Sequence, residues 1–293
     1  MSKIAIAADT NSGISRELAQ KLGVYLVCMP FSIDDQTYYE GMNLSEEDFH
    51  AKQVGGARIF TSQPAIPDVT RLWDAALADH DEVVYIPMSS GLSGSCGTAM
   101  MLAQDEDYAG RVFVPDLRRV SVTQYQAVLD AIALAGQGLD GATIAHILTE
   151  NRDRSSIYLT VEDLSYLKRG GRITPAAAAL GSVLNIKPVL QIRGDKLEAY
   201  SKCRGMKQAK RIMIEALKRE LEETFPDGFG PKDLTLHIAY AGCKEESDAL
   251  ATDLAAVFPG FSVVPANLPL SLVSHVGPGT LGLAWSGTIP ELR

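Results

Sequence analysis

The sequence predicts two α/β domains, the first with three layers around a mostly parallel sheet and the second with two layers, a mixed sheet and helices. Its 293 residues are long for one compact core and sufficient for two. Apolar runs of strand length alternate with stretches of helical periodicity, which is typical of sheets covered by helices. A polar run at 150–156 interrupts this alternation, so we expect the domains to span residues 1–155 and 156–293.

The first half alternates strand-like and helix-like stretches. We expect strands at 4–8, 24–32, 83–87 and 112–114. We expect helices at 15–21, 45–53, 66–78, 97–104 and 123–136, and a further helix that ends at the polar run. Ligands of parallel sheets bind beyond the carboxyl ends of the strands. The segment that follows the strand at 83–87 is therefore a candidate binding loop.

The second half shows a similar alternation. We expect strands at 157–161, 187–192, 196–200, 235–240 and 262–267. We expect helices at 164–167, 175–184, 206–224 and 245–257. A second α/β domain fits this order of elements.

The composition disfavours several classes of protein. A net charge of −9 argues against nonspecific nucleic-acid binding, which needs a basic surface that releases phosphate counterions. The sequence shows neither an 18-residue apolar run nor a cleavable leader, so we expect a cytoplasmic protein without stable membrane insertion. The four cysteines and five histidines lack the spacing of a disulfide framework or a metal site. We therefore expect free thiols, no metal and no cofactor.

The segment PMSSGLSGSCGTA, residues 87–99, has the composition of an anion-binding loop. Its serines and threonine supply hydroxyls, and its glycines permit close approach of a ligand. A helix that begins near Ser95 would direct free N–H groups and the positive end of its dipole toward that ligand. Ser93, Gly94 and Ser95 are therefore candidate anion ligands. A capped strand-to-helix turn explains the same composition equally well.

A second hydroxyl motif favours the anion site over the capped turn. Thr61 and Ser62 lie in the stretch FTSQP, before another expected helix with Pro67 in its first turn. Two such helix ends can face one ligand. Neither stretch has the glycine and lysine pattern of a nucleotide-binding loop, so nucleotide binding lacks support.

Five motifs together resemble the DegV family: TSQP at 61–64, SSGLSGS at 89–95, LSYLKRGGRI at 164–173, NIKPVL at 185–190 and HVGPG at 275–279. Their order and spacing agree over nearly the whole chain. The resemblance implies a non-enzymatic, lipid-binding protein that holds a long-chain fatty acid. It also implies a partner, a separate ATP-dependent fatty acid kinase subunit that phosphorylates the bound carboxylate.

The resemblance also assigns residues to the fatty acid site. It directs the carboxylate to the hydroxyls of Thr61 and Ser93, with the backbone of Gly94 and Ser95 nearby. Two residues of the second half, Arg204 and His275, are expected to approach the carboxylate end of the pocket. The complete set of candidate fatty-acid-binding residues is Thr61, Ser62, Ser93, Gly94, Ser95, Arg204 and His275.

Two other functions stay open. A stand-alone serine hydrolase or acyltransferase would use Ser93 as nucleophile and His275 as base, although GLSGS lacks the last glycine of the G-x-S-x-G pattern. A carrier for another apolar carboxylic acid is the second alternative. It gains support from one departure from the family pattern, because Leu117, Thr123 and Tyr125 replace a serine and two glycines. These larger side chains are expected to reshape the acyl pocket.

Basic residues concentrate at two places in this acidic chain. The first is around 168–172 and the second is at 202–211, before and within an expected helix start. Cations at a helix N-terminus oppose the helix dipole. A solvated face is the common explanation, and docking of an acidic kinase surface is the functional alternative.

Overall fold

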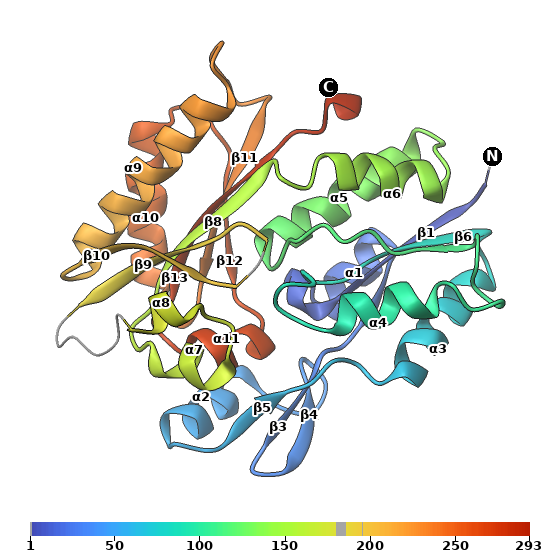
Figure 1. The fold of residues 1–293 in the computed structure, drawn as a ribbon, viewed down its shortest axis with the longest axis horizontal. Helices are drawn as coiled ribbons and strands as arrows, with labels where there is room; N and C mark the ends of the chain where they lie inside the picture. The colour runs from blue at the N-terminus through green and yellow to red at the C-terminus, as the bar shows by residue number, and fades with distance from the viewer. Residues whose placement is uncertain (1, 180–185, 195) are drawn as a thin grey trace. The chain divides into compact units, whose positions relative to one another are not determined.

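The computed structural model describes residues 2–179, 186–194 and 196–293 (Figure 1). The chain forms two compact units. The first contains the chain up to Asp153 with Pro269–Ser271 and Ile289–Leu292, and the second contains Arg154–Leu268, Leu272–Thr288 and Arg293. That the chain has two folding domains, with the boundary between residues 155 and 156, stays a prediction. The second half of the helix expected at 175–184 and the first residue of the NIKPVL motif lie outside the described residues.

The main sheet of the first unit has four strands, and each runs parallel to its neighbours. Its order is β2 (Val24–Val27), β1 (Ile4–Asp9), β6 (Glu82–Ile86) and β7 (Val112–Phe113). The predicted mostly parallel sheet is therefore confirmed. The two central strands are in register at Ala8 and Ile86, so their carboxyl ends lie next to each other.

Helices cover both faces of this sheet because successive strand residues point to opposite sides. On one face, Ile6 and Val84 pack against α1 (Arg16–Leu22), α5 (Val122–Gly136) and α6 (Gly141–Glu150). On the other face, the strands pack against α3 (Ile66–Leu77) and α4 (Ser95–Leu102). There the buried ring of Trp73 meets Tyr85 edge-on, with centroids 5.8 Å apart. These layers confirm the predicted three-layer architecture.

The first unit also contains a small antiparallel sheet that the sequence analysis did not predict. Its order is β4 (Gln36–Tyr39), β3 (Pro30–Ile33) and β5 (Ile59–Thr61), and the same unit includes α2 (Glu46–Val54) and the short η1 (Thr10–Ser12). The single strand expected at 24–32 is wrong, because β2 and β3 belong to different sheets. Both strands are largely buried, so the apolar run in the sequence is continuous. The strand partners nevertheless change from the parallel sheet to the small antiparallel sheet. The Met29 N–H between them donates to Thr10 Oγ1 over 3.0 Å, a contact that the local pattern does not reveal.

The second unit contains the predicted mixed sheet, which has six strands where the sequence analysis expected five. Its order is β10 (Glu198–Cys203), β9 (Lys187–Ile192), β8 (Ser155–Thr160), β13 (Leu281–Gly287), β11 (Leu234–Tyr240) and β12 (Val263–Asn267). The pair β11–β12 is parallel and the other pairs are antiparallel. The sequence analysis missed β13, although all seven of its residues are buried.

Two long helices cover one face of this sheet (Figure 1). They are α9 (Met206–Thr224) and α10 (Lys244–Val257), whose Leu217 and Leu250 pack with Leu236 of β11 in one buried cluster. The shorter elements of the chain's second half are α7 (Ser165–Gly170), α8 (Pro175–Ala178), α11 (Leu270–Val276) and η3 (Pro290–Leu292). No helix within the described ranges combines the length and the apolar composition needed to cross a bilayer.

Candidate functional site

Two hydroxyl-rich loops of the first unit lie in contact. One follows β5 and contains Gln63, and the other follows β6 and leads into α4, which contains Thr98. Thr98 Oγ1 donates a hydrogen bond to Gln63 Oε1 over 3.1 Å. A Cβ atom added to Gly94 would lie 3.4 Å from the same Gln63 oxygen, which leaves little room for a side chain at this position. The structure therefore brings the stretches 61–64 and 93–98 together.

The loop after β6 prepares the N-terminus of α4. This helix begins at Ser95, two residues before the expected start, and its first backbone bond runs from the Thr98 N–H to the Gly94 carbonyl over 3.0 Å. Ser93 Oγ accepts the Ser95 N–H over 3.2 Å, so the Ser93 hydroxyl keeps its own proton for donation. The first turn of α4 also presents the positive end of the helix dipole. This geometry is suited to a carboxylate or another small anion.

Ser95 contributes a feature that the sequence analysis did not anticipate. Its side chain is only 6% exposed, and its Oγ has no hydrogen-bond partner among the described residues. A buried hydroxyl without a partner costs free energy unless a bound group supplies one. The composition of the loop counted Ser95 among its hydroxyls and the resemblance gave a role to its backbone, but the residue type gives no sign of which hydroxyls lack partners in the fold.

Thr61 is the last residue of β5, and Ser62 follows it. Thr61 lies opposite the buried Phe31 in the antiparallel pair β3–β5, so both side chains share one face of the small sheet. The preceding Phe60 points to the other face and is 63% exposed. Ser62 is exposed, and its N–H donates to the Pro30 carbonyl over 3.3 Å. Strand alternation thus separates the half-buried Thr61 hydroxyl from the exposed aromatic ring.

The residues that depart from the family pattern lie in or against the core of the first unit. Leu117 is 1% exposed and belongs to the apolar cluster under α5, against which Tyr125 also packs. Thr123 is buried and donates its hydroxyl to the Val120 carbonyl over 3.0 Å. Asp116, which precedes Leu117 and keeps the aspartate of the family pattern, accepts the Ser90 hydroxyl over 2.5 Å. An effect of these residues on the acyl pocket stays a prediction.

In the second unit, two motifs pack closely against each other. His275 lies in the last turn of α11, and a Cβ atom at Gly170 would overlap its Nδ1. A Cβ atom at Gly277 would overlap the Tyr166 ring, and the φ of +76° at Gly277 also favours glycine. Gly170 of LSYLKRGGRI and Gly277 of HVGPG are therefore required by this contact.

The arginine beside His275 is Arg172, a residue that the sequence analysis placed only among surface cations. Burial, with a smaller effect of the Arg172 charge, lowers the pKa of His275 to about 4. His275 is therefore a neutral imidazole at neutral pH. Arg204 is exposed at the start of α9, where its N–H donates to Gln208 Oε1 over 3.0 Å.

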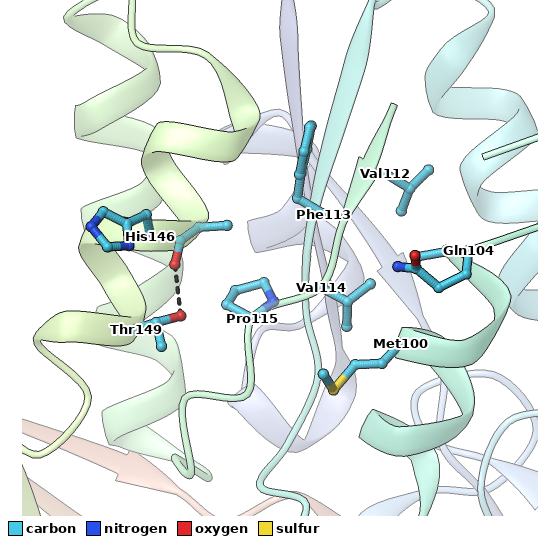
Figure 2. A pocket seen from close by; sticks show the side chains of 10 residues that line it. Met100, Gln104, Val112, Phe113, Val114, Pro115, His146 and Thr149 are labelled. Atoms are coloured by element: carbon cyan, nitrogen blue, oxygen red, sulfur yellow. Dashed lines mark hydrogen bonds between the residues drawn. The ribbon is translucent and has the colours of Figure 1, made fainter. Parts of the chain in front are cut away.

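A separate pocket of about 330 Å³ lies beside β7, the edge strand of the parallel sheet (Figure 2). Figure 2 shows Met100 of α4 and Gln104, just after this helix, on one side, His146 and Thr149 of α6 on the other, and Phe113, Val114 and Pro115 between them. None of the predicted site residues lines this pocket. It is distinct from the contact between the two hydroxyl loops.

Ionisable side chains elsewhere do not assemble a metal site. Among the residues that the structure describes, no three His, Cys, Asp or Glu side chains gather as metal ligands. All four cysteines are free thiols: Cys28, Cys96, Cys203 and Cys243.

Comparisons with known proteins agree with this fold. The chain is similar to a DegV domain-containing protein of Deinococcus radiodurans, with 31% identity over 283 residues that cover 96% of this chain and 97% of the relative. A solved structure described as fatty acid binding of a DegV family protein from Thermus thermophilus superposes with a TM-score of 0.87. It is 30% identical and covers 98% of this chain and 100% of its own. DegV of Bacillus subtilis, described as a fatty acid binding protein, has a TM-score of 0.84 at 25% identity, with 98% of this chain and 100% of that chain covered.

The five motifs of the sequence analysis are distributed over both units. A family match must therefore extend over both units to include all of them. The family model of DegV matches residues 3–288, which include all five motifs. The chain therefore belongs to the DegV family.

Proposed function

We propose that this protein binds a long-chain fatty acid and presents its carboxylate to a separate kinase subunit, which converts it to an acyl phosphate. The observation that carries the proposal is the contact of two hydroxyl loops at the N-terminus of α4, where the buried Ser95 hydroxyl has no partner among the described residues. The description of the Thermus thermophilus relative as fatty acid binding supports the choice of ligand.

The carboxylate would receive hydrogen bonds from the hydroxyls of Thr61, Ser93 and Ser95. Gly94 would let the ligand approach the backbone, and Ser62 would border the site. Hydrogen bonds to an ionised group contribute about 1.5–3 kcal/mol each. Burial of the tail contributes about 0.8 kcal/mol per methylene group, so the tail supplies most of the affinity and the hydroxyls supply the orientation.

We assign Arg204 and His275 to the transfer step rather than to binding at rest. The neutral imidazole of His275 can donate or accept one hydrogen bond without adding a charge. The exposed Arg204 can meet a partner protein and help to neutralise the phosphoryl group. In this proposal the protein itself holds no cofactor and forms no covalent intermediate, and the kinase supplies ATP in the cytoplasm.

Native mass spectrometry of the protein purified from cells tests the proposal. We expect an added mass equal to one long-chain fatty acid, which organic extraction releases. The matched sample is the double variant Ser93→Ala/Ser95→Ala, which should retain less lipid at the same yield of folded protein. Complete absence of lipid from the parent protein, together with no uptake of added fatty acid, would show that the function is wrong.

Two assays separate the proposal from its alternatives. The purified chain should neither hydrolyse activated esters nor consume ATP without a partner, whereas a serine hydrolase would turn over esters alone. A retained ligand of another mass would identify a carrier for a different apolar acid.

A further inference from the structure

Three consecutive backbone N–H groups fix the start of the loop that carries Ser93. The first belongs to Met88 and donates to Asp9 Oδ2 over 2.8 Å. The next two are held as well: the Ser89 N–H by the Arg119 carbonyl over 2.8 Å, and the Ser90 N–H by Asp116 Oδ1 over 3.4 Å. Asp9 is the last residue of the central strand β1, so a rigid element of the sheet holds the first of these groups.

The Asp9 carboxylate is fully buried and is surrounded by donors. Its Oδ2 accepts the Met88 N–H, and its Oδ1 accepts the Asn11 N–H and Gln124 Nε2, each over 3.0 Å. Both oxygens therefore act as acceptors, and the ionised form satisfies all three donors without a proton of its own to place among them. An asparagine at this position would place an amide N–H₂ against one of them.

Asn11 holds the same network from another side. Its Nδ2 donates to Met88 Sδ over 2.8 Å, and its Oδ1 accepts the Ser271 hydroxyl over 2.7 Å. All of these groups belong to the first unit. Met88 is thus held by Asp9 through its backbone N–H and by Asn11 through its side chain.

Resting on the proposed function, we propose that Asp9 is a positioning residue for the carboxylate-binding loop, whose ionised side chain holds the Met88 N–H and so fixes the backbone that presents Ser93 and Ser95. Asp9 does not touch the ligand in this account. It acts by keeping the loop ordered before the ligand arrives, which lowers the entropy lost on binding.

The proposal makes affinity depend on pH. Burial outweighs the hydrogen bonds and raises the pKa of Asp9 to about 6. The titratable groups beside it are Tyr85 of β6 and Cys96 of α4. Burial, with nearby carboxylates, raises the pKa of Tyr85 well above its ordinary value and that of Cys96 to about 12, so both stay protonated near pH 6. Protonation of Asp9 converts one acceptor oxygen into a donor, so the loop should loosen as the pH falls through about 6.

Hydrogen exchange of the ligand-free protein tests the positioning role without any assumption about the ligand. In Asp9→Asn we expect amides of residues 88–95 to exchange roughly tenfold faster at pH 7.5, while those of α9 keep their protection. Asp130→Asn is the matched control, because Asp130 is a buried carboxyl group on α5 that bonds Gln126 and lies near the Arg119 charge, whereas the Asp9 carboxylate accepts an amide of the loop directly. Unchanged exchange of the loop in a folded Asp9→Asn protein would overturn the proposal.

Fatty acid titrations between pH 5 and 8 supply the functional readout. The ratio of the Kd of Asp9→Asn to that of the parent protein should be about 10 at pH 7.5 and below about 2 at pH 5, because protonated Asp9 resembles asparagine. This ratio cancels the titration of the fatty acid itself. Asp130→Asn should follow the parent protein at every pH. A ratio that does not change with pH would contradict the role of the Asp9 charge.

A second variant keeps the test decisive if Asp9→Asn does not fold. Gln124→Met removes one donor to Asp9, so the midpoint of the parent pH profile should move upward by roughly 0.5–1 pH unit. An unmoved midpoint would overturn the proposal. If the parent protein binds no fatty acid at all, the proposed function fails, and the exchange experiment still decides whether Asp9 orders the loop.

Discussion

Thr98 Oγ1 donates to Gln63 Oε1 across 35 positions of sequence, and this bond joins the loop after β5 to α4. This hydrogen bond brings the two candidate hydroxyl motifs together. Neither residue was a predicted ligand. We infer that the bond between Thr98 and Gln63 aligns Thr61 on one side with Ser93 and Ser95 on the other.

Thr98→Val removes this bond and keeps the shape of the side chain. Because the bond is partly exposed, we expect a loss of fatty acid affinity of about 0.5–1 kcal/mol, or two- to fivefold in Kd. Isothermal titration calorimetry measures the change. Thr252→Val on α10 removes a hydroxyl that bonds the Asp248 carbonyl and should leave Kd unchanged. Equal affinity of Thr98→Val and the parent protein would mean that the two loops need no alignment.

Ser93→Ala and Thr61→Ala each remove one proposed donor to the carboxylate. We expect each to weaken binding by about 1–3 kcal/mol, because the buried charge then lacks one hydrogen bond. Ser93→Ala also removes the acceptor for the Ser95 N–H, so stability needs its own control. Ser45→Ala removes a serine hydroxyl that accepts the Asp48 N–H at the start of α2, outside both motifs, and should lower stability without lowering affinity. Full affinity in both site variants would contradict the assignment of the site.

Gly170→Ala should destabilise the second unit, because the added methyl group overlaps Nδ1 of His275. We expect a cost of about 1–3 kcal/mol in the free energy of unfolding, measured by urea titration. The double variant Gly170→Ala/His275→Ala should cost less than the sum of the two single variants. Gly136→Ala is the control, because a Cβ atom there meets no neighbour within 4 Å. Strict additivity would show that the packing of His275 on Gly170 is not what requires the glycine.

His275 should make stability depend on pH. Its pKa of about 4 in the folded protein lies below the 6.5 expected in the unfolded chain, so the unfolded state binds more protons between these values. The contribution of His275 is therefore complete above pH 6.5 and is lost as the pH falls toward 4, by roughly 3 kcal/mol in total. Urea titrations of His275→Gln should show a shallower loss over this window. Exposed His146→Gln should match the parent protein, and the same slope in His275→Gln would disprove the effect.

Much of the fold follows from local patterns, and the exceptions have physical causes. β9 and α9 were predicted with correct ends because an apolar period and clear breakers mark them. β13 was missed because its sequence LGLAWSG mixes glycine and small residues, although its central place in the sheet buries all of it. The division between β2 and β3 depends on a bond from Met29 to Thr10, which no local period encodes.

The candidate site shows the same limit. Residue type and helix position indicated Ser93, Gly94 and Ser95, but the partnerless Ser95 hydroxyl is a property of the folded environment. Arg172 was not singled out because its place beside His275 depends on the packing of Gly170 against α11. The stretch RGGRI contained the one indication of this packing, since two adjacent glycines between arginines suggest a close contact with another segment.

The central claim is that the carboxylate of a long-chain fatty acid is held by the hydroxyls at the N-terminus of α4. Carbon-13 NMR of the protein with a fatty acid labelled at its carboxyl carbon tests it most directly. We expect one saturable bound resonance whose chemical shift changes in Ser93→Ala and in Ser95→Ala but not in Ser45→Ala. A bound resonance that is identical in all four proteins, or no bound resonance in the parent protein, would contradict the account.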